Sequence, residues 1–135
     1  MDIDFIHSYL TRSYWAEGIT KEIVSRSIAW SLCFGVFNNE KQAMPADRQV
    51  GFARMVTDEA TFAYLADVFI DEDHRGKGLS KWLMKAILSH PDLQGLRRIL
   101  LATRDAHGLY AQFGFTPFTN PDRWMQLHNP DVYKH

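Results

Sequence analysis

The sequence predicts an α/β domain with a mixed central sheet, an antiparallel hairpin at its front and helices on both faces. Residues 61–70 are almost continuously apolar, as is typical of a strand in the middle of a sheet covered on both sides. Strand-type and helix-type segments then alternate, which favours parallel pairing in the centre. At 135 residues and 46% hydrophobic content, residues 1–135 are expected to form a single domain.

The first half of the chain predicts one helix and three strands. Residues 19–30, ITKEIVSRSIAW, have apolar positions near helical spacing, with Thr20 as the N-cap. The segment LCFGVFN at 32–38 is expected to be a strand, and the polar residues 38–49 a surface connection. The alternating segment QVGFARMVT at 49–57 then forms a hairpin with residues 61–70.

The second half predicts a helix from Leu79 onward, because its apolar residues recur at intervals of three and four until Pro91 ends the run. RRILLAT at 97–103 is expected to be a buried strand, AHGLYAQF at 106–113 a short helix and GFTPF at 114–118 the start of another strand. RWMQLH at 123–128 predicts a short edge strand, since the prolines around it argue against a long one.

The charge balance argues against two classes of partner. The 15 basic and 16 acidic residues nearly cancel, so we expect no binding to nucleic acid or to an anionic membrane. The start of the chain is acidic where a secretory signal is basic, and no apolar run approaches the ~20 residues of a membrane span. A cytoplasmic protein is expected. Cys33 is the single cysteine, and its apolar neighbours predict a buried thiol rather than a nucleophile.

The turn DEDHRGKG before the helix at 79 is where we expect a ligand. Gly76 and Gly78 let backbone amides face an anion, and the first turn of the helix adds unpaired N–H groups with partial positive charge. Arg75 and Lys77 are placed to add charged contacts. The alternative is an ordinary glycine turn whose cations balance the acidic residues. The P-loop and dinucleotide-binding patterns are absent, because Lys81 stands where the third glycine of G-x-G-x-x-G belongs.

Two motifs, some 30 residues apart, give a family resemblance. RGKGLS follows the pattern R/Q-x-x-G-x-G/A through Arg75 and Gly78, with Ser80 in the last place. AHGLYAQFGF follows A-x-x-x-Y-x-x-x-G-F. With this order and spacing, residues 1 to about 120 resemble the GCN5-related N-acetyltransferases (GNAT), most of all the small single-domain bacterial members. The fixed places of the second motif are held by Ala106, Tyr110, Gly114 and Phe115.

The resemblance implies that acetyl-CoA is the co-substrate, that no metal is used and that the strands at 61–70 and 97–103 splay apart around the pantetheine arm. Ser80 replaces the usual Gly or Ala, a change that we expect the site to tolerate because serine is small and can donate. Thr103 stands where many members carry Asn, which puts one polar contact near the arm in doubt. The arm would bind the backbone of Val68, Phe69 and Ile70. The pyrophosphate would bind residues Arg75, Gly76, Lys77, Gly78, Leu79 and Ser80.

Three residues are candidates for proton transfer. Asp67 interrupts an apolar strand, so it is either the general base or a structural carboxylate paired with Arg54. His107 is a second candidate base or relay, or else a capping or packing residue. Tyr110 matches the family position that protonates the departing CoA thiolate; the alternative is a packed tyrosine whose hydroxyl is merely satisfied.

The leading hypothesis is therefore an acetyl-CoA-dependent N-acetyltransferase that acts on an amine of a small molecule or a protein. An acyl-CoA-binding sensor without turnover and a purely structural domain are the alternatives. Tyr9, Tyr14 and Trp15 either line the acceptor pocket or belong to the core. The resemblance is also compatible with a homodimer formed through the predicted C-terminal strand.

Overall fold

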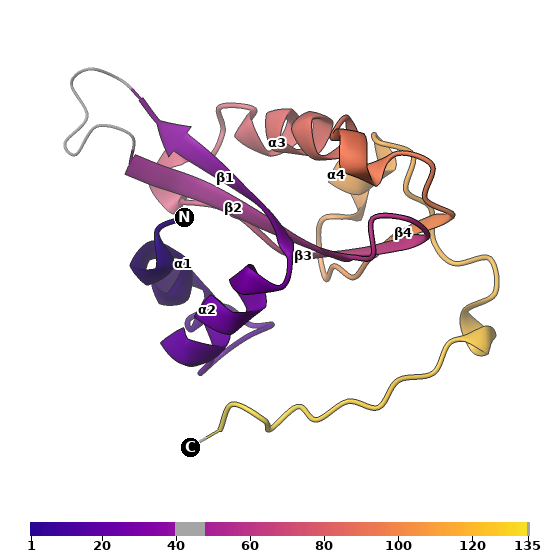
Figure 1. Cartoon of the computed structure of the whole chain (residues 1–135), viewed down its shortest axis with the longest axis horizontal. Coiled ribbons are helices and arrows are strands. Elements are labelled where there is room, and N and C mark those ends of the chain that lie inside the picture. The colour runs from indigo at the N-terminus through magenta and orange to yellow at the C-terminus, as the bar shows by residue number, and fades with distance from the viewer. Residues whose placement is uncertain (40–47, 135) are drawn as a thin grey trace.

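A computed structural model of the chain describes residues 1–39 and 48–134 (Figure 1). Within these residues, two α-helices precede a four-stranded sheet, a third follows the third strand and a fourth follows the last strand. Three short 3-10 helices complete the structure. The helices are α1 (Ile3–Leu10), α2 (Lys21–Ala29), α3 (Leu79–Leu88) and α4 (His107–Ala111), and the strands are β1 (Leu32–Asn38), β2 (Arg48–Thr57), β3 (Phe62–Ile70) and β4 (Arg98–Leu101).

The sheet is mixed, as predicted. Its order is β1-β2-β3-β4, with antiparallel pairing from β1 to β3 and parallel pairing between β3 and β4. Asp58 closes the β2–β3 hairpin, because its carboxylate accepts hydrogen bonds from the backbone N–H groups of Ala60, Thr61 and Phe62. The hydroxyl of Thr61 also donates to this carboxylate, and that bond, together with the backbone bonds, holds the pKa of Asp58 far below its ordinary value.

A β-bulge lies in the middle of β3. Phe52 pairs with Phe69 and Arg54 with Ala66, so the single residue Ala53 faces both Asp67 and Val68. Asp67 takes the left-handed conformation, with φ of 56°, which aspartate tolerates better than most residues. The bulge reorients the strand at the half-buried Asp67.

The pairing between β3 and β4 also ends in this region. Their parallel pairing runs from Phe62 opposite Arg98 to Leu65 opposite Leu101, where β4 ends, while β3 continues to Ile70. Within the described residues, the last part of β3 therefore has no strand on its β4 side. The splay that the family resemblance implied is present.

Helices cover both faces of the sheet, as predicted (Figure 1). On one face, Leu83, Met84 and Ile87 of α3 pack with buried residues of the sheet and with Tyr110. On the other, α1 and α2 pack over the aromatic residues Phe52 and Phe69 of β2 and β3. The sheet thus separates two apolar clusters.

The two N-terminal helices begin at side-chain caps. Thr20 accepts a hydrogen bond from Ile23 N, as predicted for the N-cap of α2, and Asp2 accepts one from Phe5 N at the start of α1. α1 was not predicted. Its signals were the Asp2 cap and the spacing of Ile6 and Leu10, both of which are buried.

Two predicted strands are wrong. Residues 114–118 form no strand, because Pro117 lacks an N–H and Phe115 packs into the core instead of pairing. Residues 123–128 form none either, since no strand of the described chain lies beside them, and residues 121–132 are exposed throughout. Most of the predicted connection at 38–49 lies outside the described residues.

Candidate functional site

A cavity of about 530 Å³ opens beside the end of the β3–β4 pairing. Its walls come from the loop before α2, from α2 itself, from β2 and β3, from the segment after β4, from α4 and from Tyr133 near the end of the chain. Of the residues predicted for the site, the cavity brings together four. These are Asp67, Val68, Thr103 and Tyr110.

The start of α3 is open to an anion. Gly78 is the N-cap, with φ of 76°, and having no side chain it cannot cap the helix, so the first-turn N–H groups are left for another acceptor. Gly76 also has positive φ, and an added Cβ at either glycine would meet no atom within 4 Å. Lys77 is exposed, Ser80 is half-buried, and the Leu79 side chain packs into the α3-side core.

Arg75 is held in place by two elements that are distant in sequence. Its Nε donates to the carbonyl oxygen of Ile70 at 3.1 Å, and its Nη2 donates to the hydroxyl of Tyr9 at 2.6 Å. The Tyr9 ring in turn stacks on Phe69, with the ring centroids 3.9 Å apart. α1 therefore fixes the guanidinium beside the start of α3, with its remaining N–H groups available.

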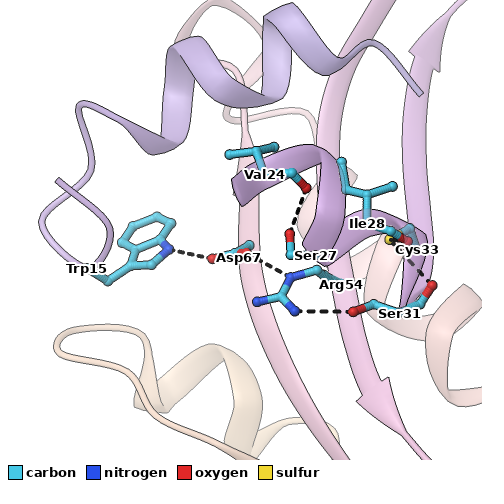
Figure 2. Close-up of polar contacts among 8 residues, drawn as sticks. All are labelled: Trp15, Val24, Ser27, Ile28, Ser31, Cys33, Arg54 and Asp67. Carbon is cyan, nitrogen blue, oxygen red and sulfur yellow. Dashed lines mark hydrogen bonds and ion pairs between the residues drawn. The ribbon is translucent and has the colours of Figure 1, made fainter. Parts of the chain in front are cut away.

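Asp67 lies in a network of four side chains, with Trp15, Arg54 and Ser31 (Figure 2). One carboxylate oxygen accepts from Arg54 Nε and the other from Trp15 Nε1, each at 2.9 Å, while Arg54 Nη1 donates to Ser31 Oγ at 3.2 Å. The side chains of Asp67 and Arg54 are only 10% and 19% exposed. The pairing with Arg54 is thus present, and a carboxylate with about four acceptor positions still has some left for a substrate.

Tyr110 faces the same cavity from α4 and is 8% exposed. Burial raises the pKa of its phenol above the ordinary value, and the nearby Tyr14 raises it further, so the phenol carries its proton at neutral pH. Gly114, with φ of 92°, turns the chain after α4 so that Phe115 N donates to Tyr110 O, and the Phe115 ring packs edge-on against Tyr110. Gly114 and Phe115 of the second motif therefore hold this tyrosine in position.

The other predicted residues lie as follows. His107 is exposed at the first position of α4 and does not line the cavity. Thr103 Oγ1 accepts from Ala106 N at 3.1 Å, so its hydroxyl organises the turn into α4. The side chains of Phe69 and Ile70 are buried, and the carbonyl oxygen of Ile70 accepts from Arg75 Nε.

The N-terminal aromatic residues lie in two different places. Tyr14 and Trp15 line the cavity, whereas Tyr9 packs with the α1-side core. Arg104 lies over the Tyr14 ring, with its Cζ 3.9 Å from the ring centroid, and its guanidinium is 3.7 Å from Asp105. The hydrogen bond between Trp15 and Asp67 joins residues 52 apart, a link that no local sequence pattern carries.

Other reactive groups are few in the part of the chain that the structure describes. Cys33 is half-buried, where a buried thiol was predicted, and burial raises the pKa of this thiol above its ordinary value. Within residues 1–39 and 48–134, no three His, Cys, Asp or Glu side chains gather in a way that suits a metal ion. Over the same residues, no helix combines the length and apolar character needed to cross a membrane.

Comparisons with known proteins agree with this geometry. Residues 30–117 match the family model of the acetyltransferase (GNAT) domain. A candidate acetyltransferase of Gibberella zeae is 30% identical over 128 residues, covering 83% of this chain and 71% of the fungal protein. Splayed parallel strands beside an open helix start define the class as a GNAT-type fold, and the chain belongs to the GNAT acetyltransferase family.

Solved structures show the same fold. A candidate GNAT-family acetyltransferase from Xanthomonas campestris is 51% identical, with a TM-score of 0.92, and the match covers 100% of this chain and 91% of that one. A candidate acetyltransferase from Clostridium acetobutylicum, determined with acetyl-CoA, is 16% identical, with a TM-score of 0.65 over 94% of this chain and 90% of that one. The latter likeness is one of fold.

The pair formed by Arg54 and Asp67 predicts a loss of stability when its charge is removed. We expect Asp67→Asn to lower the free energy of unfolding by about 2 kcal/mol at pH 7, because it leaves a half-buried guanidinium without its carboxylate. Asparagine tolerates the left-handed backbone, so the loss in free energy of unfolding measures the missing charge of the carboxylate rather than backbone strain. Urea unfolding measures it, and Arg54→Met combined with Asp67→Asn should recover part of the loss. A variant as stable as the wild type would contradict this account.

Proposed function

We propose that the chain transfers an acetyl group from acetyl-CoA directly to an amine of a small molecule or a protein. The observation that carries this proposal is the free edge of β3 after Leu65, which leads to the uncapped start of α3 at Gly78. An extended amide-bearing arm pairs with a free strand edge, and a pyrophosphate suits a helix start. Family membership and the acetyl-CoA in the Clostridium structure support the same co-substrate.

In this proposal the two ends of the co-substrate have separate sites. The backbone of Val68, Phe69 and Ile70 holds the arm, and residues 75–80 hold the pyrophosphate. The positive φ of Gly76 and Gly78 and the open space around both glycines support the second assignment, because an anion can approach the backbone closely there. Arg75, already fixed by Tyr9, would add a charged contact.

Asp67 is proposed to accept the proton of the incoming amine, directly or through water. An alkylammonium of pKa ~10.4 is about 3.4 units from half-deprotonated at pH 7, a deficit of ~4.6 kcal/mol, so a proton acceptor is required. Asp67 lines the cavity, and Trp15 and Arg54 fix both of its oxygens in place. His107 is the weaker candidate, because it is exposed outside the cavity.

Tyr110 is proposed to give its proton, or a hydrogen bond, to the departing thiolate. Its raised pKa keeps the phenol protonated, and its hydroxyl makes no hydrogen bond within the described chain, which leaves it for a ligand. The alternative function, an acyl-CoA-binding sensor, needs residues 75–80 but not Tyr110. Turnover therefore separates the two functions.

The wider organisation is also a proposal. We infer that residues 1–135 act as one acetyltransferase domain in the cytoplasm without a metal, and that two copies associate. Met125 and Leu127 support association, since both are fully or almost fully exposed in a segment without a partner strand among the described residues. The predicted C-terminal strand is not needed for this contact.

Calorimetric titration tests the co-substrate site. The wild-type protein should bind acetyl-CoA saturably and bind ATP, which lacks the arm, much more weakly. Gly78→Glu should raise the dissociation constant for acetyl-CoA by at least about tenfold, because a carboxylate then faces the α3 amides. Gly95→Glu is the matched control, since Gly95 is also exposed, with φ of 75° and open space for a Cβ. An equal loss in both variants, or no acetyl-CoA binding by the wild type, would contradict the proposal.

Replacement of Tyr110 tests the acid. Tyr110→Phe keeps the ring that packs against Phe115, so affinity for acetyl-CoA should stay within a few-fold while turnover of an accepted amine falls at least about tenfold. Thiol release from acetyl-CoA measures the turnover. Turnover equal to that of the wild type would remove Tyr110 from the acid role.

A further inference from the structure

The last described part of the chain returns to the cavity after a long exposed course. Residues 121–132 are exposed throughout, but Tyr133 is half-buried and packs against the α1-side core. A local turn presents it, closed by hydrogen bonds from Val132 N to Asn129 O and from Lys134 N to Asp131 O. Tyr133 alone makes this contact with the core, because its neighbours Val132 and Lys134 are exposed.

Gly18 makes this return possible. An added Cβ at Gly18 would lie 2.8 Å from the carbonyl oxygen of Tyr133, and Gly18 has φ of 85°. Backbone thus meets backbone at a distance that any other residue would prevent. Gly18 follows Tyr14 and Trp15 in the loop that lines the cavity, so the contact joins the end of the chain to that wall.

The cavity has two chemically different sides. Tyr110 and the free edge of β3 belong to the side proposed for acetyl-CoA, whereas Tyr14, Trp15 and Tyr133 lie with the loop before α2. The charged residues of the lining are Arg54, Asp67, Arg104 and Asp105, and each cation is paired with one acid, at 2.9 Å and 3.7 Å. The described lining therefore carries two cations and two acids, so it has no excess positive charge to attract a phosphate or a carboxylate.

We propose that Tyr133 forms part of the acceptor wall and that this wall selects primary amines carried on an uncharged apolar or aromatic skeleton. Aromatic faces bury such a skeleton and attract an arriving ammonium group, while a phosphorylated amine would lose part of its hydration in a cavity whose charges balance. This inference rests on the proposed function and adds the class of acceptor and a residue that determines specificity.

Titrations of 2-phenylethylamine and glucosamine 6-phosphate, with and without saturating CoA, test the wall. The wild type should bind 2-phenylethylamine at least about tenfold more tightly than glucosamine 6-phosphate. Tyr133→Ala should weaken the binding of 2-phenylethylamine at least about fivefold, while its affinity for acetyl-CoA stays within about twofold of the wild-type value. Tyr133→Phe should retain binding, since the ring forms the wall. Gly18→Ala should weaken binding as Tyr133→Ala does, because it displaces the Tyr133 backbone.

Val132→Ala is the control, because Val132 is the exposed neighbour of Tyr133 and should leave both affinities unchanged. Equal or tighter binding of glucosamine 6-phosphate by the wild type, or unchanged binding of 2-phenylethylamine by Tyr133→Ala, would overturn the inference. If the wild type did not bind acetyl-CoA, that result would contradict the proposed function. The amine titrations without CoA would still test whether Tyr133 contributes to amine binding.

Discussion

The site depends on one irregularity in β3: two residues, Asp67 and Val68, stand opposite the single residue Ala53. An extra residue bends a strand and sharpens its twist. Here it lies just beyond Leu65, where the pairing with β4 stops, so the sheet opens where β3 changes direction. The left-handed backbone at Asp67 is compensated by the hydrogen bonds of its carboxylate to Arg54 and Trp15.

That irregularity places the parts of the site on opposite sides of the sheet. The α3 side carries the glycine turn and the braced Tyr110, which suit an anion and a leaving group. The α1 side carries the aromatic loop, which suits the acceptor. Tyr9 links the two sides, because its ring packs on Phe69 while its hydroxyl holds Arg75. Changes in the N-terminal helix should therefore reach the anion site.

Much of this arrangement was predictable from local sequence. Thr20 as a cap, the hairpin and the helix from Leu79 follow from residue preference and periodicity, and the two motifs indicated where the site lies. The strands at 114–118 and 123–128 were wrong, because an alternating sequence becomes a strand only beside a partner backbone. No short stretch of sequence could predict the hydrogen bonds of Asp67 and Arg75 or the contact between Tyr133 and Gly18. Each of them joins residues that are far apart in the chain.

Backbone hydrogen exchange tests the central claim, that acetyl-CoA lies along the free edge of β3 with its pyrophosphate at the start of α3. The exchange of single amides should be followed by NMR with and without saturating acetyl-CoA. We expect the amides of Val68, Gly78, Leu79 and Ser80 to slow by at least about tenfold, because each gains an acceptor, while those of the exposed Met125 and Leu127 keep their rates. Saturation with acetyl-CoA that leaves the α3 and β3 amides unchanged, or slows exchange only elsewhere, would contradict the account.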